Sequence, residues 1–536
     1  MGIRLIAGRS GSGKSTYIYE QVVKAAADDP KQSYFVIVPD QFTMQTQLDM
    51  VNASACKGIL NIEVLSFSRL AHRVFEETGG NRCPVLDDTG KNLILRRCAI
   101  EVKDEIPYLA GKLNKPGYIH EVKSAISEFM QYGINNDCMH TLIEYADKGN
   151  KITLKKKLMD LSVIYEHFKE YIKERYITSE ETHNILSRDI YRCHLLKDSI
   201  VIFDGFTGFT PIQNDVLESL VDVCKDVIFT LNVDPGILTT GSVNDNDIFS
   251  FSYKSFASLT ELAKKHIEVI RVEEIEPGKR YADSAELSFL EKHLLRNDGA
   301  VYDNECTDIH MDSYHGIRDD VRGLATHIRE LVREKNICYR DIAVITGNLE
   351  AYAGEIEDVL EEYGIPYYLD RNRGIVLNPF VEFIKSALDI YARDFNYETV
   401  FRYLRTGFCG ISNEDVDMLD DYVTAAGIRG NSIYSHLFCK KTSVVSPEEA
   451  EAVRVKFMDS LAPFADAGIK VGGTYSASLY VKTLYDFIVK NDCAAKLDAY
   501  SEMFKEQGDH SKALEYSQIY RHTMHLLEQI HDLLAD

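Results

Sequence analysis

An eight-residue motif near the amino terminus constrains this chain more than any other feature of its sequence. Residues 8–15, Gly-Arg-Ser-Gly-Ser-Gly-Lys-Ser, fit the phosphate-binding pattern G-x-x-x-x-G-K-[ST] at every fixed position. A short apolar run over residues 3–7 precedes the motif, and a helical pattern over residues 15–27 follows it. This order of strand, loop and helix is the setting in which such a loop binds nucleotide phosphates. The motif therefore predicts an α/β domain with a nucleotide site at the start of its first helix.

The motif assigns an expected role to each of its residues. Lys14 is expected to reach the outer phosphates, and the Ser15 hydroxyl to ligate Mg²⁺ at the positive end of the helix dipole. The predicted cofactor is ATP with Mg²⁺. A glycine-rich turn that fits the pattern by chance is the alternative interpretation. The loop residues expected to surround the phosphates with their backbone N–H groups are Gly8, Arg9, Ser10, Gly11, Ser12 and Gly13.

Composition limits the class of protein. The 536 residues are 45% hydrophobic, which is enough for several buried cores. The eleven cysteines are scattered singly and form no C-x-x-C or zinc-finger pattern, as expected for reduced thiols in the cytoplasm. No secretory signal or membrane-spanning stretch is evident, so we expect no membrane association. The net charge of −23 argues against a surface that attracts nucleic acid everywhere, but it permits a local basic channel.

Four further apolar runs predict buried strands over residues 33–38, 62–67, 199–203 and 226–231. Each run ends in polar residues, and helical patterns separate the runs. Strands that alternate with helices predict a parallel sheet whose ligand site lies along the carboxyl ends of its strands. The polar residues after each strand are therefore expected to lie together at one edge of the sheet.

The remaining pattern predicts four parts. A first sheet domain over residues 1–86 and 197–295 is interrupted by a helical insertion over 87–196, in which an apolar stripe from Leu154 to Ile172 predicts one long helix. A second sheet domain is predicted over 296–377, with strands at 310–314, 341–346 and 365–369. From residue 378 to 536 the pattern is almost wholly helical and has no stop signal, so we expect a second insertion in a truncated chain.

This layout, two phosphate-loop (RecA-like) parallel-sheet domains that each hold a helical insertion, resembles a superfamily 1 helicase. Motif II of that superfamily is D-E-F-Q-D, and the aligned run here begins Asp204-Gly205-Phe206. Asp204 can still help to hold Mg²⁺, but Gly205 has no side chain to position or deprotonate the attacking water. We therefore expect slow hydrolysis or none. Asp40 or Asp234, each at a strand end, could replace the missing carboxylate.

Several segments together are similar to the AddB family, one of the two subunit types of the bacterial AddAB ATP-dependent helicase–deoxyribonucleases. They are residues 38–43, 64–75 and 204–211, and, in the second half, residues 364–370 and 403–407. The resemblance covers most of the first 410 residues and rests on helical character beyond them. It implies a partner, an AddA-like helicase-nuclease subunit, with which the protein would process double-stranded DNA ends for recombination.

The resemblance also implies that the helicase-like part scans single-stranded DNA for a short sequence called Chi. The residues that match the family's DNA site are Gln41, Thr43, Phe67, Arg69, His72 and Phe209, with His72 where a relative has tryptophan. Aromatic rings can stack on splayed bases, and the polar side chains can pair with base edges or phosphates. For Phe67, packing in the core of the sheet is the equally favoured alternative.

Members of the family also carry a nuclease domain and an iron–sulfur cluster near their carboxyl end. No D…E-x-K pattern or cluster-type cysteine spacing occurs in this sequence. We therefore expect this chain to lack nuclease activity. Because Gly205 replaces the catalytic glutamate, we also expect it to lack helicase activity of its own. Two alternatives remain open. One is an autonomous phosphate-loop enzyme, either a DNA motor or a small-molecule kinase, and the other is a structural scaffold for a partner subunit.

Overall fold

A computed structural model describes residues 2–79, 83–113, 115–240, 243–266, 270–275, 280–296, 298–371 and 374–534. The chain divides into two compact units, residues 1–310 and 311–536. The finer division into four parts stays a prediction. None of the helices in the described ranges is both long and apolar enough to cross a bilayer.

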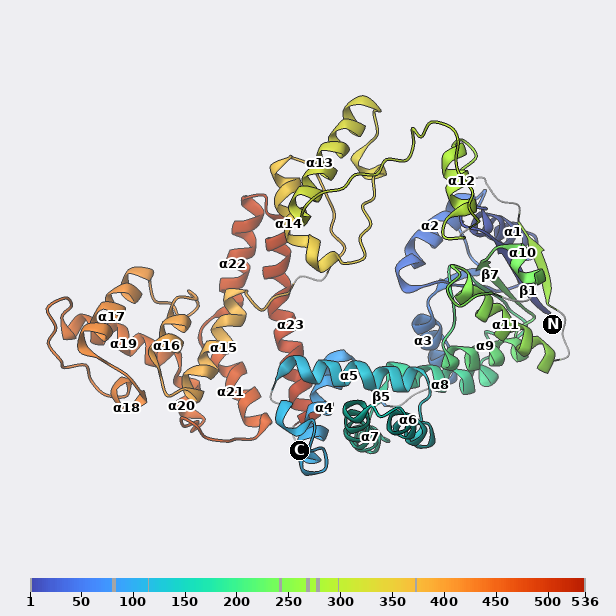
Figure 1. The fold of residues 1–536 in the computed structure, drawn as a ribbon. Coiled ribbons are helices and arrows are strands. Elements are labelled where there is room, and N and C mark those ends of the chain that lie inside the picture. The colour runs from blue at the N-terminus through green and yellow to red at the C-terminus, as the bar shows by residue number, and fades with distance from the viewer. Residues whose placement is uncertain are drawn as a thin grey trace. The chain divides into compact units, whose positions relative to one another are not determined.

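The first unit is built on a six-stranded sheet whose paired strands are all parallel (Figure 1). Five strands were predicted from apolar runs. The sixth, at the edge, was not predicted, because its sequence Arg-Val-Glu-Glu is mostly polar. In spatial order the strands are β3 (Ile62–Leu65), β2 (Tyr34–Ile37), β6 (Ile200–Phe203), β7 (Asp226–Asn232), β1 (Gly2–Gly8) and β8 (Arg271–Glu274).

Helices cover both faces of this sheet. The helices α1 (Lys14–Asp28) and α2 (Thr43–Ala53) bury Ile18, Val22 and Met50 against one face. The helices α3 (Phe67–Thr78), α9 (Pro211–Val223) and α11 (Ser250–Lys265) pack on the other face. Because both faces are covered, the inner strands are apolar along nearly their whole length, as parallel strands of this kind require. The predicted α/β fold with a parallel sheet is confirmed for this unit.

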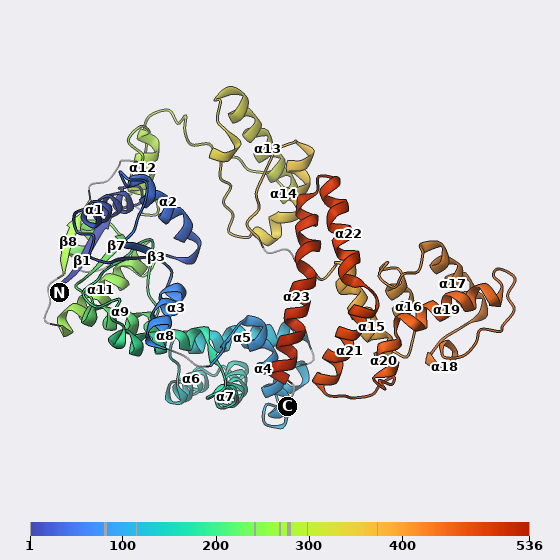
Figure 2. The same cartoon turned by 180° about the vertical axis from the view of Figure 1, so that it is seen from behind.

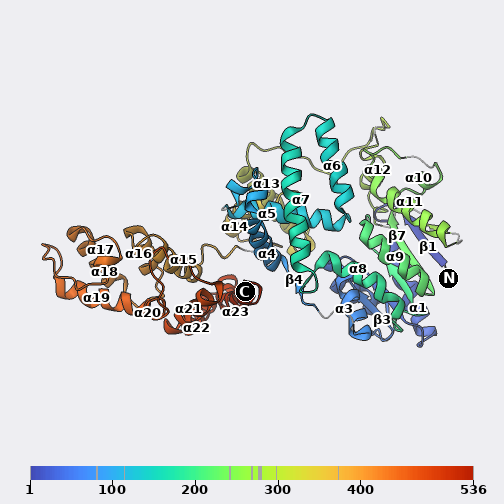
Figure 3. The same ribbon diagram turned by 90° about the horizontal axis from the view of Figure 1, so that it is seen from below.

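A two-stranded parallel ladder joins the start of the helical insertion to a point near its end, where β4 (Val85–Leu86) pairs with β5 (Ile177–Thr178). The predicted long helix forms as α7, and its apolar stripe is buried from Leu161 onward, whereas Leu154 is exposed. Figure 3 shows α7 beside α6. The helices of the insertion are α4 (Asp88–Glu101), α5 (Pro116–Gln131), α6 (Asn136–Lys148), α7 (Ile152–Ile172) and α8 (Ser179–Asp189).

Two short helices complete the first unit. They are α10 (Pro235–Thr240), which follows β7, and α12 (Ala285–His293), which lies beyond β8. Single turns of 3₁₀-helix occur as η1 (Asp40–Phe42), η2 (Lys103–Glu105), η3 (Ala110–Lys112) and η4 (Ile190–Arg192).

The second unit corrects part of the predicted fold. The strands predicted at 310–314, 341–346 and 365–369 do not form, although all these residues are described. Instead, α13 (Ile317–Glu334) and α14 (Leu349–Glu362) pack on each other, and Ile345 and Tyr368 are exposed. A strand pattern yields a strand only where another strand pairs with its backbone groups, and none of these segments has such a partner within the described ranges. The second sheet domain is therefore not confirmed.

The helical pattern predicted from residue 378 onward is confirmed. Figure 2 shows the last two helices side by side, as a hairpin. The helices are α15 (Pro379–Ala392), α16 (Tyr397–Leu404), α17 (Asn413–Ala426), α18 (Asn431–Tyr434), α19 (Pro447–Ser460), α20 (Ala462–Asp466), α21 (Ala477–Lys490), α22 (Cys493–Glu506) and α23 (His510–Leu534).

A buried ion pair ties the insertion together. Lys91 on α4 is 1% exposed, and its ammonium lies 2.9 Å from both carboxylate oxygens of Glu180 on α8. It also donates to the hydroxyl of Ser127 on α5 at 3.2 Å. Burial opposes ionisation of Glu180, but the hydrogen bonds and charge of Lys91 outweigh burial and hold the pKa of this carboxyl below its ordinary value.

Replacing Lys91 with methionine should lower the free energy of unfolding by about 3–5 kcal/mol, because the Glu180 carboxylate would stay buried without its cation. Urea denaturation measures the change. Because folding lowers the pKa of Glu180, the stabilisation is present above its unfolded pKa of about 4.3 and is lost as the pH falls through the folded value. Lys155→Met, which breaks a surface pair with Asp147, is the control and should cost less than about 1 kcal/mol. Equal losses for the two variants would contradict this account.

Candidate functional site

The phosphate-loop motif lies at the carboxyl end of β1, as the sequence predicted, and α1 begins at Lys14. The loop is covered from outside by the chain after β8. The Arg280 N–H donates to the carbonyl of Gly11 at 3.2 Å, and the Tyr281 ring packs on the same glycine. Gly11 has φ +71°, and a Cβ there would lie 2.7 Å from the ring. Glycine is therefore required at this position by both conformation and space.

The Lys14 side chain is turned back onto its own loop. Its ammonium donates to the carbonyls of Gly8 at 2.9 Å and Arg9 at 2.8 Å. Burial lowers the pKa of Lys14 to about 8, although the charge of Asp204 opposes this shift. The nearby positive charge of Arg280 lowers the pKa further. Lys14 and Arg280 thus bring two cationic side chains to the loop, where bound phosphates would need them.

Asp204 lies at the end of β6, two strands away from the loop, and is 4% exposed. Three hydroxyl groups donate to its carboxylate. Ser15 donates to Oδ1 at 3.2 Å, Thr230 on β7 donates to the same oxygen, and Tyr19 on α1 donates to Oδ2 at 2.5 Å. Burial, and then the charge of Asp204, raise the pKa of Tyr19, which keeps its phenol protonated as a donor. The sequence-predicted pair of Ser15 and Asp204 is thus in direct contact.

These two side chains offer the oxygen ligands that Mg²⁺ prefers. Mg²⁺ in nucleotide sites needs only one or two protein ligands, because phosphates and water supply the others. Within the described ranges, no group of three or more His, Cys, Asp and Glu side chains is placed to hold a metal ion alone. The residues therefore fit a magnesium ion that arrives with a nucleotide.

Gly205, which follows Asp204, has φ +80°, in the left-handed region that side chains other than glycine rarely adopt. A Cβ built at this position would point toward Pro39, 3.5 Å from its Cδ, and toward the ring of Phe42 at 4.0 Å. Position 205 therefore has no carboxylate, and a glutamate placed there would have a strained backbone conformation.

Both alternative carboxylates have partners in the structure, and those of Asp234 are the stronger. Asp234, after β7, forms ion pairs with Arg9 at 3.4 Å and with Arg296 at 2.7 Å. Burial would raise the pKa of Asp234, but the hydrogen bond from Arg296 and both positive charges hold it below the ordinary value. Asp40 accepts a hydrogen bond from the hydroxyl of Ser68 at 3.2 Å.

The residues predicted to bind DNA follow β2 and β3, apart from Phe209. The hydrogen bond between Ser68 and Asp40 joins the two loops. Gln41, Arg69 and His72 are exposed there, whereas Thr43 is buried, and its hydroxyl donates to the Asp40 carbonyl at 3.0 Å.

The two predicted stacking rings belong to an aromatic cluster. Phe67 is only 6% exposed, and its ring contacts those of Phe203, Phe206 and Phe209, with centroids 5.5–6.4 Å apart. Phe209 is half-buried at the rim of this cluster. In this structure the faces of Phe67 are covered, so a base would meet Phe209 before Phe67.

The sequence analysis missed four side chains that lie in or beside the candidate site. Tyr19 resembled a core residue of α1, although its position four residues after Ser15 places both on one face. Thr230 is the one polar residue in the run Val227–Leu231 of β7, which was the available signal. Phe42, between Gln41 and Thr43, has a ring that is 47% exposed. Arg280 had no recognisable motif.

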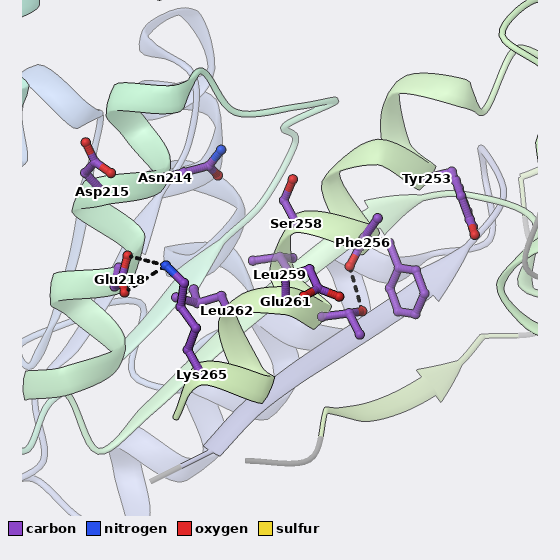
Figure 4. A pocket seen from close by; sticks show the side chains of 12 residues that line it. Asn214, Asp215, Glu218, Tyr253, Phe256, Ser258, Leu259, Glu261, Leu262 and Lys265 are labelled. Carbon is purple, nitrogen blue, oxygen red and sulfur yellow. Dashed lines mark hydrogen bonds and ion pairs between the residues drawn. The ribbon is translucent and has the colours of Figure 1, made fainter. Parts of the chain in front are cut away.

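A cavity of about 550 Å³ lies between α9 and α11, away from these loops (Figure 4). Its lining includes the acidic side chains of Asp215, Glu218 and Glu261, and Lys265 bridges to Glu218 at 3.3 Å. None of the sequence-predicted site residues lines it. The candidate nucleotide and DNA residues therefore form a separate region at the carboxyl ends of the strands.

Comparison with known proteins identifies similar chains. Residues 5–291 match the family model described as "ADDB, N-terminal". Three relatives are each named as a subunit of an ATP-dependent helicase/deoxyribonuclease. They come from Lachnoclostridium phytofermentans, 34% identical, Acetivibrio thermocellus, 32%, and Alkaliphilus oremlandii, 30%. Each alignment covers 100% of this chain but only 47%, 47% and 48% of the respective relative. The chain thus spans about half the length of these curated relatives.

Restoring the missing carboxylate should not restore fast hydrolysis. Gly205→Glu is expected to destabilise the protein by about 1–3 kcal/mol, because the new side chain is forced into a left-handed conformation. ATP turnover should not rise above that of the parent protein. Gly58→Glu, at a glycine with no positive φ and with open space around it, is the matched control. Thermal denaturation and phosphate release measure the outcome, and fast turnover without loss of stability would contradict this account.

Proposed function

Because the chain belongs to the AddB family, we propose that it forms the helicase-like part of an AddB subunit in an ATP-dependent helicase/deoxyribonuclease. The names of its relatives support an assembly of more than one subunit. The proposed partner is an AddA-like subunit that supplies the motor. The proposed task is the processing of DNA ends for repair by recombination, in which this part scans the single strand for a Chi-like sequence.

The proposed nucleotide site is the loop after β1. ATP or ADP would bind there with Mg²⁺, which Ser15 and Asp204 would hold. Bound with the nucleotide, the ion neutralises phosphate charge. Lys14 would exchange the carbonyls of Gly8 and Arg9 for phosphate oxygens, which are better partners for an ammonium because they carry charge. Arg280 would add a second positive charge from outside the loop.

Slow or absent turnover rests on one observation, the glycine at position 205. Hydrolysis requires a group that orients or deprotonates water beside the γ-phosphate. Gly205 has no such group, Asp234 is paired with two arginines, and Asp204 receives three hydroxyl donors. These contacts support a site that keeps a nucleotide bound without converting it rapidly.

The proposed DNA surface lies over β2, β3 and the loop after β6. Gln41, Arg69 and His72 are exposed there and can meet base edges or phosphates. The exposed ring of Phe42 and the half-buried ring of Phe209 are available for stacking on bases. Phe67 would support this surface from below, because its ring is buried. Truncating this ring would itself cost stability.

The wild-type protein should bind ADP with Mg²⁺ and hydrolyse ATP far more slowly than about ten per second, a typical enzyme turnover, with or without single-stranded DNA. Lys14→Ala should abolish binding in calorimetry, because it removes the charge that meets the phosphates. Lys24→Ala, on an exposed turn of the same helix, should bind normally. Fast DNA-stimulated turnover would instead identify an autonomous motor. Nucleotide-dependent thermal stabilisation without affinity for single strands would identify a scaffold.

Arg69→Ala should weaken binding of single-stranded DNA. If Arg69 contacts a phosphate, the slope of log K against log salt concentration should also fall by about 0.7. If it contacts a base edge, the loss should depend on sequence while the slope changes little. Arg73→Ala is the control one turn along α3, because Arg73 is already paired with Glu63 at 3.2 Å. Fluorescence anisotropy with labelled oligonucleotides distinguishes these results. Unchanged binding by Arg69→Ala would remove this residue from the DNA surface.

A further inference from the structure

Hydroxyl groups from the helix α1 and from the neighbouring strand β7 surround the carboxylate of Asp204. Ser15 and Thr230 donate to Oδ1, and Tyr19 donates to Oδ2 at 2.5 Å. Tyr19 and Thr230 are both buried, at 7% and 4% exposure. The phosphate-loop motif accounts for Ser15, but it does not account for the other two donors.

The Tyr19 hydroxyl is itself held in place. Its oxygen lies 3.4 Å from the hydroxyl of Thr46 on α2, which is 4% exposed. A phenol has one proton, and the Tyr19 hydroxyl donates it to Oδ2 of Asp204. Thr46 must then donate to Tyr19. The result is a chain of hydroxyls that runs from Thr46 through Tyr19 to Asp204, with one direction of donation.

We infer that Tyr19 is a positioning residue for the magnesium–nucleotide complex, and this inference rests on the nucleotide binding proposed above. By holding Oδ2, Tyr19 fixes the rotation of the Asp204 carboxylate about its bond to Cβ. Oδ1 is thereby kept at 3.2 Å from the Ser15 hydroxyl, where the ion would be held. Thr230 acts on Oδ1 from the β7 side in the same way.

The ring of Tyr19 is suited to this role because packing fixes it. It lies in the apolar cluster between α1 and the sheet, with Ile6, Val22 and Met50. A tyrosine has only two side-chain torsions, so little freedom remains once its ring is buried. Without this donor, Oδ2 would be buried with no partner, and the carboxylate would gain by rotating away from Ser15.

The same arrangement explains why binding and turnover can be separated at this site. The Asp204 carboxylate presents Oδ1 beside Ser15, where it can hold a cation. The hydroxyl donors on both oxygens occupy lone pairs that a general base would use to accept a proton from water. Tyr19 and Thr230 thus favour retention of the metal-bound nucleotide over its hydrolysis.

Tyr19→Phe tests the inference, because it keeps the ring and removes only the hydroxyl. The complete protein, purified with any subunit that accompanies it, is titrated with ADP in excess Mg²⁺ and with ADP in EDTA. Affinity in Mg²⁺ should fall by about tenfold or more, the ratio that corresponds to one hydrogen bond to a charged group. Affinity in EDTA should stay unchanged, because the loop itself is intact.

Tyr17→Phe is the matched control. Tyr17 lies on the same helix, is 37% exposed, and its hydroxyl contacts Glu273 at 3.2 Å, outside the site. Its affinity for ADP should be unchanged in both conditions. Thr230→Val provides a second variant, in case Tyr19→Phe unfolds, and should show the same loss confined to Mg²⁺.

The outcomes separate this inference from the function on which it rests. If the wild-type protein fails to bind ADP in either condition, the proposed nucleotide site is wrong. If the wild-type protein binds and both variants match it in Mg²⁺, the positioning role of Tyr19 and Thr230 is overturned. Equal losses in Mg²⁺ and in EDTA would also overturn it, because they would show that the hydroxyls only support the fold.

Discussion

Parallel pairing of β6, β7 and β1 is the constraint on which the candidate site depends. The register places Phe203 beside Phe229 and Gly8 beside Asn232, so the loop after β1 and the residue after β6 emerge at the same edge of the sheet. Ser15 and Asp204, which are far apart in the sequence, meet only because of this alignment. Apolar residues pack against helices on both faces of these strands, so a slip by one residue would exchange the side chains that meet one layer of helices for those that meet the other.

The strand order also arranges the two halves of the proposed function. The phosphate loop follows β1, the candidate DNA residues Gln41 and Arg69 follow β2 and β3, and β6 lies between these groups. The loop after β6 therefore belongs to both halves. It begins with Asp204 and continues through Gly205, which faces Phe42, to Phe209 at the rim of the aromatic cluster. A shift of this loop would therefore alter both the candidate nucleotide site and the candidate DNA surface.

The local sequence was sufficient to predict the elements that have both a clear pattern and a neighbouring element to pair with. The buried strands of the first sheet follow from continuous apolar runs, and the phosphate loop follows from its glycines. The segments at 341–346 and 365–369 have similar patterns, but they have no pairing partner among the residues that the structure describes and form no strand there. Tyr19 and Thr230 escaped prediction because a hydroxyl in an apolar run looks the same whether it meets water, a carbonyl or a distant carboxylate. For Phe67 the sequence left two interpretations, a contact with a base or packing in the core of the sheet, and its 6% exposure agrees with the second.

The short ladder between β4 and β5 has a consequence for how this architecture can vary. Val85 pairs with Ile177, so the two ends of a long helical segment are joined side by side where they leave the sheet domain. The entropy of closing that loop is offset by the ladder and by the buried pair of Lys91, near the start of the segment, with Glu180, just beyond its end. The two positions at which the segment joins the sheet domain therefore lie close together, as the two ends of a short turn would. Segments of other lengths could be exchanged at this junction during evolution while the phosphate loop and its neighbours keep their geometry.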